Sequence, residues 1–143
     1  MEYITKNLNQ TLALAKSIAK DFTGGEILLL QGDLGAGKTA FTKGVANALC
    51  INSIVTSPTF TIMNVYSSGK LNLYHFDMYR IQDDSEIREL GFNEYIGAKD
   101  GVCCVEWFTQ TPQLFAGKMC TFINIEKIDD NTRKFTIENK IFN

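Results

Sequence analysis

The sequence predicts one α/β domain, residues 1–143, with a mixed parallel and antiparallel sheet and flanking helices. Near its start, a short apolar run, a glycine-rich loop and an amphipathic stretch follow one another, which is typical of a strand leading into a helix. Hairpin patterns follow later in the chain, and hairpins add antiparallel strands. No linker, repeat or low-complexity tract separates these parts, so we expect one hydrophobic core.

Helical periodicity predicts a first helix over residues 9–19, where apolar side chains recur every three or four positions. Residues 26–31 contain the unbroken apolar run 27–30, which is typical of a strand buried on both faces. A second helix is expected over residues 38–49, because apolar residues recur at helical spacing from Phe41 onward.

The rest of the chain alternates between turn residues and short strand patterns. The turns at 67–70 and 129–131 contain serine, glycine, asparagine or aspartate, which favour tight turns. The expected elements are, in order, residues 61–66 and 71–76 as one hairpin, residues 84–90 as a short helix capped by Asp84 or Ser85, residues 102–105 as an apolar strand, and residues 119–126 and 133–138 as a closing hairpin.

The composition argues against several classes of function. The formal net charge is −2 and the pI is near 5.4, so we expect any RNA to enter through a partner protein. No apolar run approaches the ~20 residues that span a bilayer, and residues 1–9 lack the layout of a secretory signal. We therefore expect a cytoplasmic protein without membrane contact. The four cysteines form no C-x-x-C pair and are expected to be small core residues, since Cys103 and Cys104 cannot face one metal from a strand.

The segment from Gly32 to Thr39 satisfies the pattern G-x-x-x-x-G-K-[ST] in the context that it requires, between an apolar strand and a helix. Gly35 and Gly37 let the backbone curl, so that N–H groups form an anion nest at the helix N-terminus. Lys38 adds a mobile cation that hydrolysis requires, and the Thr39 hydroxyl can bind Mg²⁺. The alternative interpretation is a glycine-rich turn with an exposed lysine, which would not require a strand before it and a helix after it. The sequence therefore predicts a P-loop NTPase-like domain that binds ATP, or a closely related triphosphate, with Mg²⁺.

A P-loop protein needs another carboxylate, at the end of a neighbouring strand, to hold Mg²⁺. Asp77 ends residues 71–76, which alternate like a hairpin strand at the sheet margin, and Glu106 ends residues 102–105, which are apolar throughout. Because a central parallel strand is uniformly apolar, the contrast favours Glu106 beside the metal and leaves Asp77 to orient or activate the attacking water. Either acid considered alone is equally consistent with a capping or surface carboxylate.

Four blocks of sequence occur in a fixed order: residues 32–39 (GDLGAGKT), 57–61 (SPTFT), 75–80 (HFDMYR) and 105–107 (VEW). With these blocks the chain closely resembles the TsaE (YjeE) family of small bacterial P-loop ATPases, which are needed for threonylcarbamoyl-adenosine modification of tRNA. The resemblance runs from about Thr11 to Arg133. Four ordered blocks are far more specific than the glycine-rich loop alone.

The resemblance implies roles for individual positions. Thr39 and Glu106 would lie at Mg²⁺, and Asp77 would be required for hydrolysis. Residues 57–61 would act as a switch segment near the γ-phosphate, and Thr11, ahead of the first helix, matches a position near the nucleotide base. The residues implied to bind the triphosphate are Leu34, Gly35, Ala36, Gly37, Lys38, Thr39 and Ala40.

The resemblance also implies partners and an activity. Proteins of this family act with TsaB and TsaD in a nucleotide-dependent complex, in which TsaD transfers the threonylcarbamoyl group. The expected activity is a slow, Mg²⁺-dependent ATPase that its partners activate and that supports or regulates their transfer reaction. The tRNA would be met only indirectly, through the complex.

Three residues keep two interpretations, and a fourth, Arg133, has one. His75, the only histidine, is either a hydrogen-bonded structural group or a participant beside Asp77. Trp107 either packs in the fold or lies at the active site, as the resemblance implies. Arg80 either ends a strand in solvent or holds acidic groups across the site, and Arg133 is a weakly supported nucleotide contact.

Two other functions stay open. A P-loop small-molecule kinase would carry arginine-bearing lid segments, but arginines occur only at Arg80, Arg88 and Arg133, and no lid-length insertion is present. The second function is that of a binding module that is gated by a nucleotide and does not hydrolyse it. The chain lacks the [NT]-K-x-D motif that reads guanine, which favours ATP over GTP.

Overall fold

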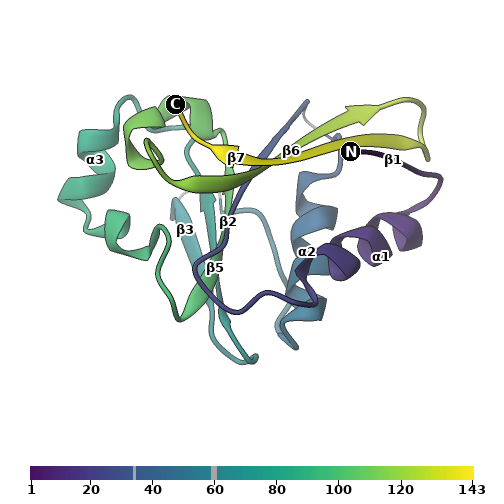
Figure 1. The fold of residues 1–143 in the computed structure, drawn as a ribbon, viewed down its shortest axis with the longest axis horizontal. Coiled ribbons are helices and arrows are strands. Elements are labelled where there is room, and N and C mark those ends of the chain that lie inside the picture. Colours follow the sequence, from purple (N-terminus) through teal and green to yellow (C-terminus); the bar gives the residue numbers. More distant parts are fainter. Residues whose placement is uncertain (34, 59–60) are drawn as a thin grey trace.

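A seven-stranded mixed sheet crosses the protein in a computed structural model that describes residues 1–33, 35–58 and 61–143 (Figure 1). The spatial order of the strands is β1-β7-β6-β2-β5-β4-β3. The strands are β1 (Glu2–Thr5), β2 (Ile27–Gly32), β3 (Met63–Tyr66), β4 (Asn72–Asp77), β5 (Gly101–Glu106), β6 (Met119–Lys127) and β7 (Arg133–Ile141). Strands β6, β2, β5 and β4 run parallel, and antiparallel strands flank them on both sides. The single α/β domain with a mixed sheet is as predicted.

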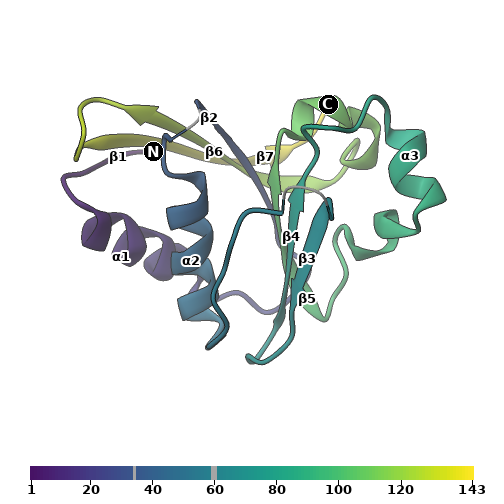
Figure 2. The same ribbon diagram turned by 180° about the vertical axis from the view of Figure 1, so that it is seen from behind.

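Helices cover both faces of this sheet (Figures 1 and 2). Helices α1 and α2 pack on one face, and α3 packs on the other face with the short 3-10 helices. The elements are α1 (Leu8–Ala19), α2 (Lys38–Ala48), α3 (Asp84–Glu89), η1 (Phe92–Tyr95), η2 (Phe108–Gln110) and η3 (Pro112–Leu114). Both long helices and both hairpins lie where the sequence predicts them, within a few residues at each end.

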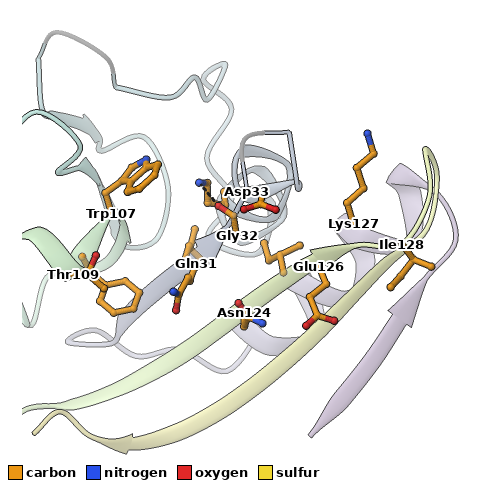
Figure 3. Close-up of a pocket in the computed structure, with 13 residues that line it drawn as sticks. Gln31, Gly32, Asp33, Trp107, Thr109, Asn124, Glu126, Lys127 and Ile128 are labelled. Atoms are coloured by element: carbon orange, nitrogen blue, oxygen red, sulfur yellow. Dashed lines mark hydrogen bonds between the residues drawn. The ribbon is translucent and has the colours of Figure 1, made fainter.

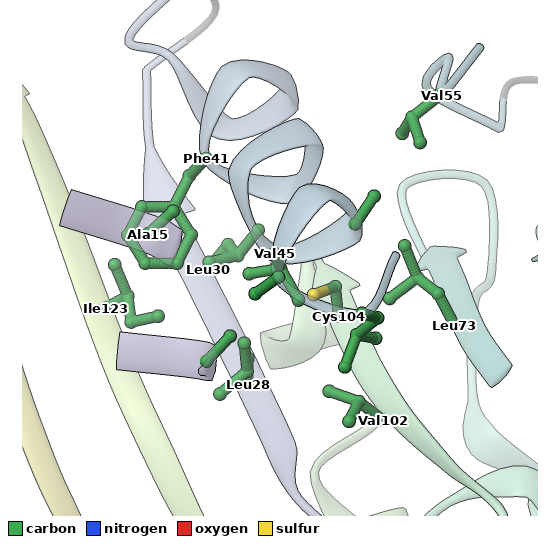
Figure 4. Packing of buried hydrophobic residues seen from close by; sticks show 14 of the residues in the cluster. Ala15, Leu28, Leu30, Phe41, Val45, Val55, Leu73, Val102, Cys104 and Ile123 are labelled. Carbon is green, nitrogen blue, oxygen red and sulfur yellow. The ribbon is translucent and has the colours of Figure 1, made fainter. Parts of the chain in front are cut away.

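The central strands bury side chains on both faces because successive residues of a strand point to opposite sides. Leu28 and Leu30 of β2 pack beneath α1 and α2 (Figure 4), whereas Leu29 belongs to the core on the opposite face. In β5, Cys104 lies in the first core and Cys103 in the second. The two adjacent cysteines therefore face opposite sides of the sheet, as the strand prediction requires.

Helices α1 and α2 touch closely at Gly44. A Cβ at this position would lie 2.5 Å from the Cβ of Ala15 and 2.7 Å from the carbonyl oxygen of Leu12. A hydrogen atom in place of a side chain thus lets the two helices approach. Because α2 begins at the glycine-rich loop, this contact also sets where the loop is held.

Three details differ from the sequence-based expectation. Strand β1 was not predicted, and it pairs with β7 at the edge of the sheet. The cap of α3 is Asp83, one residue before the expected position, because its extended backbone lets the carboxylate accept from the Ser85 N–H at 2.9 Å. Cys50 is exposed in a left-handed conformation (φ 62°) after α2, whereas the other three cysteines are buried.

The largest correction concerns β4. Its alternating sequence suggested a marginal strand, but β3 forms that edge and β4 lies between β3 and β5. His75 reads as a polar position and yet is fully buried, like the residues on either side of it. The alternation therefore came from one buried polar side chain, and not from a solvent-exposed face.

Within the described part of the chain, none of the helices has both the length and the apolar character needed to cross a membrane.

Candidate functional site

The glycine-rich loop joins the carboxyl end of β2 to the first turn of α2. Gly35 (φ 80°) and Gly37 (φ 115°) adopt left-handed conformations that other residues rarely accept, which explains the two glycines. The Ala36 N–H donates to the Asp33 carbonyl at 2.9 Å, which closes a turn before the helix. The first N–H groups of α2 have no partner within the helix and favour an anion. Leu34, expected to bind the triphosphate, lies outside the described residues.

Lys38 folds back over this loop. Its ammonium donates to the Gly32 carbonyl at 2.8 Å and lies 5.1 Å from the ring centroid of Trp107. The residue is only 8% exposed, so the charge is largely removed from water. A cation held by one carbonyl and a ring face is available to a stronger, anionic partner.

Glu106 and Asp77 lie side by side where two parallel strands end. The register pairs Asp77 with Glu106, and Glu106 with Leu30 of β2. Both acids therefore lie at the carboxyl ends of their strands, on the side of the sheet where β2 leads into the glycine-rich loop. Glu106 is 4% exposed and its Oε2 lies 2.7 Å from Nε2 of His75. His75 is thus hydrogen-bonded to a predicted functional acid, a contact that fits both interpretations of this residue.

Asp77 is half-buried and its carboxylate accepts from the Tyr79 N–H at 3.0 Å. Burial raises the pKa of this carboxyl above its ordinary value, the Tyr79 N–H lowers it, and the nearby Glu106 carboxylate raises it further. The Asp77 N–H donates to the Ile62 carbonyl at 2.8 Å. Through this bond Asp77 is tied to the chain that follows the predicted switch segment.

A pocket of about 590 Å³ opens beside the loop and extends over β2 and β6 (Figure 3). Trp107 and Thr109 lie on one side and Glu126 on the other, with Gln31 between them. The lining residues are Leu30, Gln31, Gly32, Asp33, Lys38, Trp107, Phe108, Thr109, Asn124, Ile125, Glu126, Lys127 and Ile128. The pocket mixes charged, amide and apolar groups, with Lys38 at its wall.

Trp107 is the most exposed aromatic side chain of this pocket. It is 41% exposed, its ring packs against that of Tyr79 with centroids 4.9 Å apart and planes tilted by 59°, and its backbone is left-handed at φ 57°. Such a conformation costs about 1–3 kcal/mol for a residue other than glycine, and it turns the chain directly after Glu106. Of the two interpretations of Trp107, the structure therefore favours a place at the site.

The other predicted site residues lie in α2, in α1 and in the segment 57–61. Thr39 and Ala40 are in the first turn of α2 and are partly exposed. Thr11 lies inside α1, not ahead of it as expected, and its buried hydroxyl lies 2.8 Å from that of Thr5. In the segment 57–61, Thr59 and Phe60 lie outside the described residues, so only its ends can be placed.

Sequence reasoning did not find the residues that β6 contributes. Asn124 and Glu126 read as the polar face of a hairpin strand, but β6 is also the parallel neighbour of β2 and lines the pocket. The guanidinium of Arg133, a weak expectation, lies against the glycine-rich loop, with Nε 2.8 Å from the Ala36 carbonyl oxygen. Only the alternating pattern of residues 119–126 indicated this strand, and that pattern does not show which strand lies parallel to it.

Comparison with known proteins finds a matching family. A profile of the family described as "Threonylcarbamoyl adenosine biosynthesis protein TsaE" matches residues 5–135. The tRNA threonylcarbamoyladenosine biosynthesis protein TsaE of Bacillus subtilis (strain 168) is 51% identical over 107 residues, covering 75% of this chain and 66% of that protein. The protein of the same name from Aquifex aeolicus (strain VF5) is 39% identical over 142 residues, covering 97% and 96%. The Bacillus match thus spans just under two thirds of its relative, and the Aquifex match spans nearly all of it.

A solved structure extends the likeness to the fold. A crystal structure of Bacillus subtilis YdiB superposes with a TM-score of 0.77 at 39% sequence identity, covering 99% of this chain and 85% of that one. The sheet and the helices that surround the site therefore have a counterpart in an experimental structure.

Proposed function

Because the chain belongs to the TsaE family of threonylcarbamoyl adenosine biosynthesis proteins, we propose that it is a slow, Mg²⁺-dependent ATPase of tRNA modification, built as one P-loop domain over residues 1–143. One observation carries the proposal. The glycine-rich loop, Lys38 and the two carboxylates of Asp77 and Glu106 all lie at the carboxyl ends of neighbouring parallel strands. Triphosphate binding needs the loop and the lysine, and hydrolysis needs the two carboxylates.

The triphosphate would bind to residues 34–40, at the glycine-rich loop and the first turn of α2. The positive φ angles of Gly35 and Gly37 support a curled backbone that presents N–H groups to phosphate oxygens. Lys38 would exchange the Gly32 carbonyl for phosphate oxygens, which bind an ammonium more strongly. Thr11 is proposed near the base only from the family resemblance, since its hydroxyl faces Thr5.

Thr39 and Glu106 would hold Mg²⁺. The donor set fits this ion, because Mg²⁺ prefers hydroxyl and carboxylate oxygens. The hydrogen bond to His75 uses Oε2 of Glu106, and a carboxylate offers a second oxygen. Bound with the nucleotide, Mg²⁺ supplies charge stabilisation on the phosphate oxygens.

Asp77 would orient the attacking water. The water oxygen forms a bond to the γ-phosphorus while the bond from that phosphorus to the ADP oxygen breaks, and a proton of the water passes to an oxygen of the released phosphate, which yields ADP and inorganic phosphate. The Asp77 carboxylate accepts a hydrogen bond from this water, and its bond from the Tyr79 N–H fixes the carboxylate plane. Lys38 stabilises the charge that develops on the phosphate oxygens.

The proposed partners are TsaB and TsaD, in a complex that forms with the triphosphate and handles the tRNA. Exposed aromatic side chains beside the loop support an interface there, since Trp107 and Tyr79 are 41% and 59% exposed. Hydrolysis would then support or regulate the transfer carried out by the partners.

Phosphate release tests the proposal most directly. The purified chain, given ATP and Mg²⁺, should release phosphate slowly, and faster with TsaB and TsaD present. Nucleotide binding without phosphate release under both conditions would indicate a non-hydrolysing binding module. Absence of ATP binding, measured by calorimetry, would refute the assignment.

A further inference from the structure

The guanidinium of Arg133 lies against the glycine-rich loop, although the two are nearly a hundred residues apart in the chain. Its Nε donates to the Ala36 carbonyl at 2.8 Å, and its Nη2 lies 3.4 Å from the Gly35 carbonyl oxygen. The planar fork of an arginine suits two neighbouring acceptors. The first residue of β7 thus binds two consecutive carbonyl groups of the loop.

The other side of the same guanidinium is anchored in the turn between β6 and β7. Nη1 donates to the Asp129 carbonyl at 2.7 Å and lies 3.3 Å and 3.2 Å from the carbonyl oxygens of Asp130 and Thr132. The turn is itself closed by the Asp129 carboxylate, which accepts from the N–H groups of Asn131 and Thr132 at 2.9 and 2.8 Å. Arg133 therefore connects two structured segments and does not extend freely into solvent.

The bond to Ala36 has a consequence for the nest. In a trans peptide the C=O and the following N–H point in opposite directions, and the described residues contain no cis peptide. When Arg133 holds the Ala36 carbonyl, the Gly37 N–H must point to the opposite side of the loop. The two glycines leave this backbone free to rotate, so such an orientation needs an external restraint.

We propose that Arg133 is a positioning residue that holds the Gly35 and Ala36 carbonyls, and thereby preorients the Gly37 N–H for phosphate. The proposal rests on the proposed function, because the phosphate is taken to be that of a bound nucleotide. Arg133 acts through the loop backbone and need not touch the nucleotide. The benefit is preorganisation, since a loop that is already ordered loses less entropy on binding.

Hydrogen exchange of the nucleotide-free protein tests the restraint without any nucleotide. Arg133→Gln should increase the exchange rate of the Ala36 amide, which is bonded to the Asp33 carbonyl, about tenfold, the effect of ~1.4 kcal/mol in the local opening equilibrium. Arg133→Lys keeps the charge but loses the fork and should restore at most part of the protection. Lys134→Gln is the matched control, because Lys134 pairs with Glu2 at 3.3 Å and should leave the loop unchanged.

Nucleotide titration gives the second measurement. In Arg133→Gln the affinity for ADP and ATP should fall about tenfold, while turnover at saturating ATP and Mg²⁺ changes less than KM. AMP, which lacks the β-phosphate, should bind wild type and variant equally.

The outcomes separate the alternatives. Unchanged exchange, with or without weaker nucleotide binding, would overturn the proposal, since weaker binding alone would mean a direct contact with the nucleotide. Faster exchange throughout β6 and β7 in both variants would also overturn it, by making Arg133 a general structural residue. Faster exchange confined to the loop, in a protein that binds no nucleotide, would refute the proposed function and leave the positioning role intact.

Discussion

Lys38 carries a buried charge between the glycine-rich loop and Trp107. The residue is almost fully buried, its ammonium donates to the Gly32 carbonyl and faces the Trp107 ring, and the Asp77 carboxylate lies close enough to interact with it electrostatically. Lys38→Ala should weaken ATP binding by ~1.5–3 kcal/mol and abolish hydrolysis, because the nest loses its mobile cation. Calorimetric titration measures the affinity, and the fluorescence of Trp107, the single tryptophan, reports the same site.

The exposed Lys43 lies on the same helix, so Lys43→Ala provides the control and should bind ATP normally. Unchanged affinity and normal turnover in Lys38→Ala would rule out the P-loop assignment.

The two carboxylates can be separated by their amide variants. Glu106→Gln should need much more Mg²⁺ for both ATP binding and turnover if Glu106 holds the metal. An amide oxygen can still accept a hydrogen bond from His75, so the variant should fold. Asp77→Asn should bind ATP and Mg²⁺ nearly normally and lose kcat alone, because orienting water matters only in the transition state.

Magnesium titrations of binding and of phosphate release, made on both variants, distinguish these roles. If Asp77→Asn shows the magnesium defect and Glu106→Gln only the loss of kcat, the two roles are exchanged.

At the scale of elements, the contact between α1 and α2 depends on the absence of a side chain. Gly44→Ala would place a Cβ 2.7 Å from the backbone oxygen of Leu12, which a side-chain rotation cannot relieve. Overpacking of this kind costs about 1–3 kcal/mol, which exceeds the gain of about 1 kcal/mol in helix propensity. Thermal unfolding should therefore show a lower Tm for Gly44→Ala, with Lys43→Ala unchanged as the control. A Tm equal to wild type would mean that the helices separate without cost.

Strand β5 carries two thiols that burial keeps protonated. Burial raises the pKa of Cys103 from 9.0 to about 12, and it raises the pKa of Cys104 as well. The folded chain thus keeps protons that the unfolded chain loses above pH 9, so stability should fall as the pH rises from about 9 to 12. The slope is up to ~1.4 kcal/mol per pH unit for each thiol.

Denaturant unfolding at several alkaline pH values measures this slope. Cys50→Ser should not change it, because Cys50 is exposed, and a thiol reagent at pH 8 should modify Cys50 ahead of the buried thiols. Stability that is constant or rises over this range would contradict the expected protonation.

Patterns local in sequence predicted the elements well. Strand β2, helix α2 and both hairpins follow from periodicity and turn residues, and the glycine-rich loop follows from its spacing. Pairings between distant segments did not follow. Nothing in residues 119–126 indicates that β6 lies parallel to β2, so the β6 side of the pocket was missed. From the sequence, His75 had two interpretations and no partner, because the acid that it contacts, Glu106, lies 31 positions away.

For the whole molecule, charge limits what the protein can bind alone. A net charge of −2 gives no general attraction to the phosphate backbone of RNA. Free tRNA should therefore bind weakly, and the tRNA should be met through partners. A protein that acts on other proteins in one nucleotide state needs a surface that changes with that state.

The segment 57–61 is the proposed source of that change. The chain after it is tied to the site, because the Ile62 carbonyl accepts from the N–H of Asp77 at 2.8 Å. On the other side, the Thr56 N–H donates to the Tyr66 hydroxyl at 3.1 Å. A γ-phosphate with Mg²⁺ would order the segment between these anchors, as switch loops are ordered in other P-loop proteins.

We therefore expect docking on TsaB–TsaD with triphosphate, and weaker docking after hydrolysis. A tenfold ratio of affinities corresponds to ~1.4 kcal/mol, which the contacts of one γ-phosphate can supply. Light scattering or pull-down against TsaB–TsaD, with an ATP analogue, with ADP and without nucleotide, measures this ratio. Equal binding in all three states would remove the switch and leave the ATPase assignment standing, whereas failure to bind in any state would contradict the proposed partners. Trp107→Ala should weaken docking in the ATP-analogue state, since Trp107 lies 41% exposed beside Lys38 and would join the ordered segment in the contact surface.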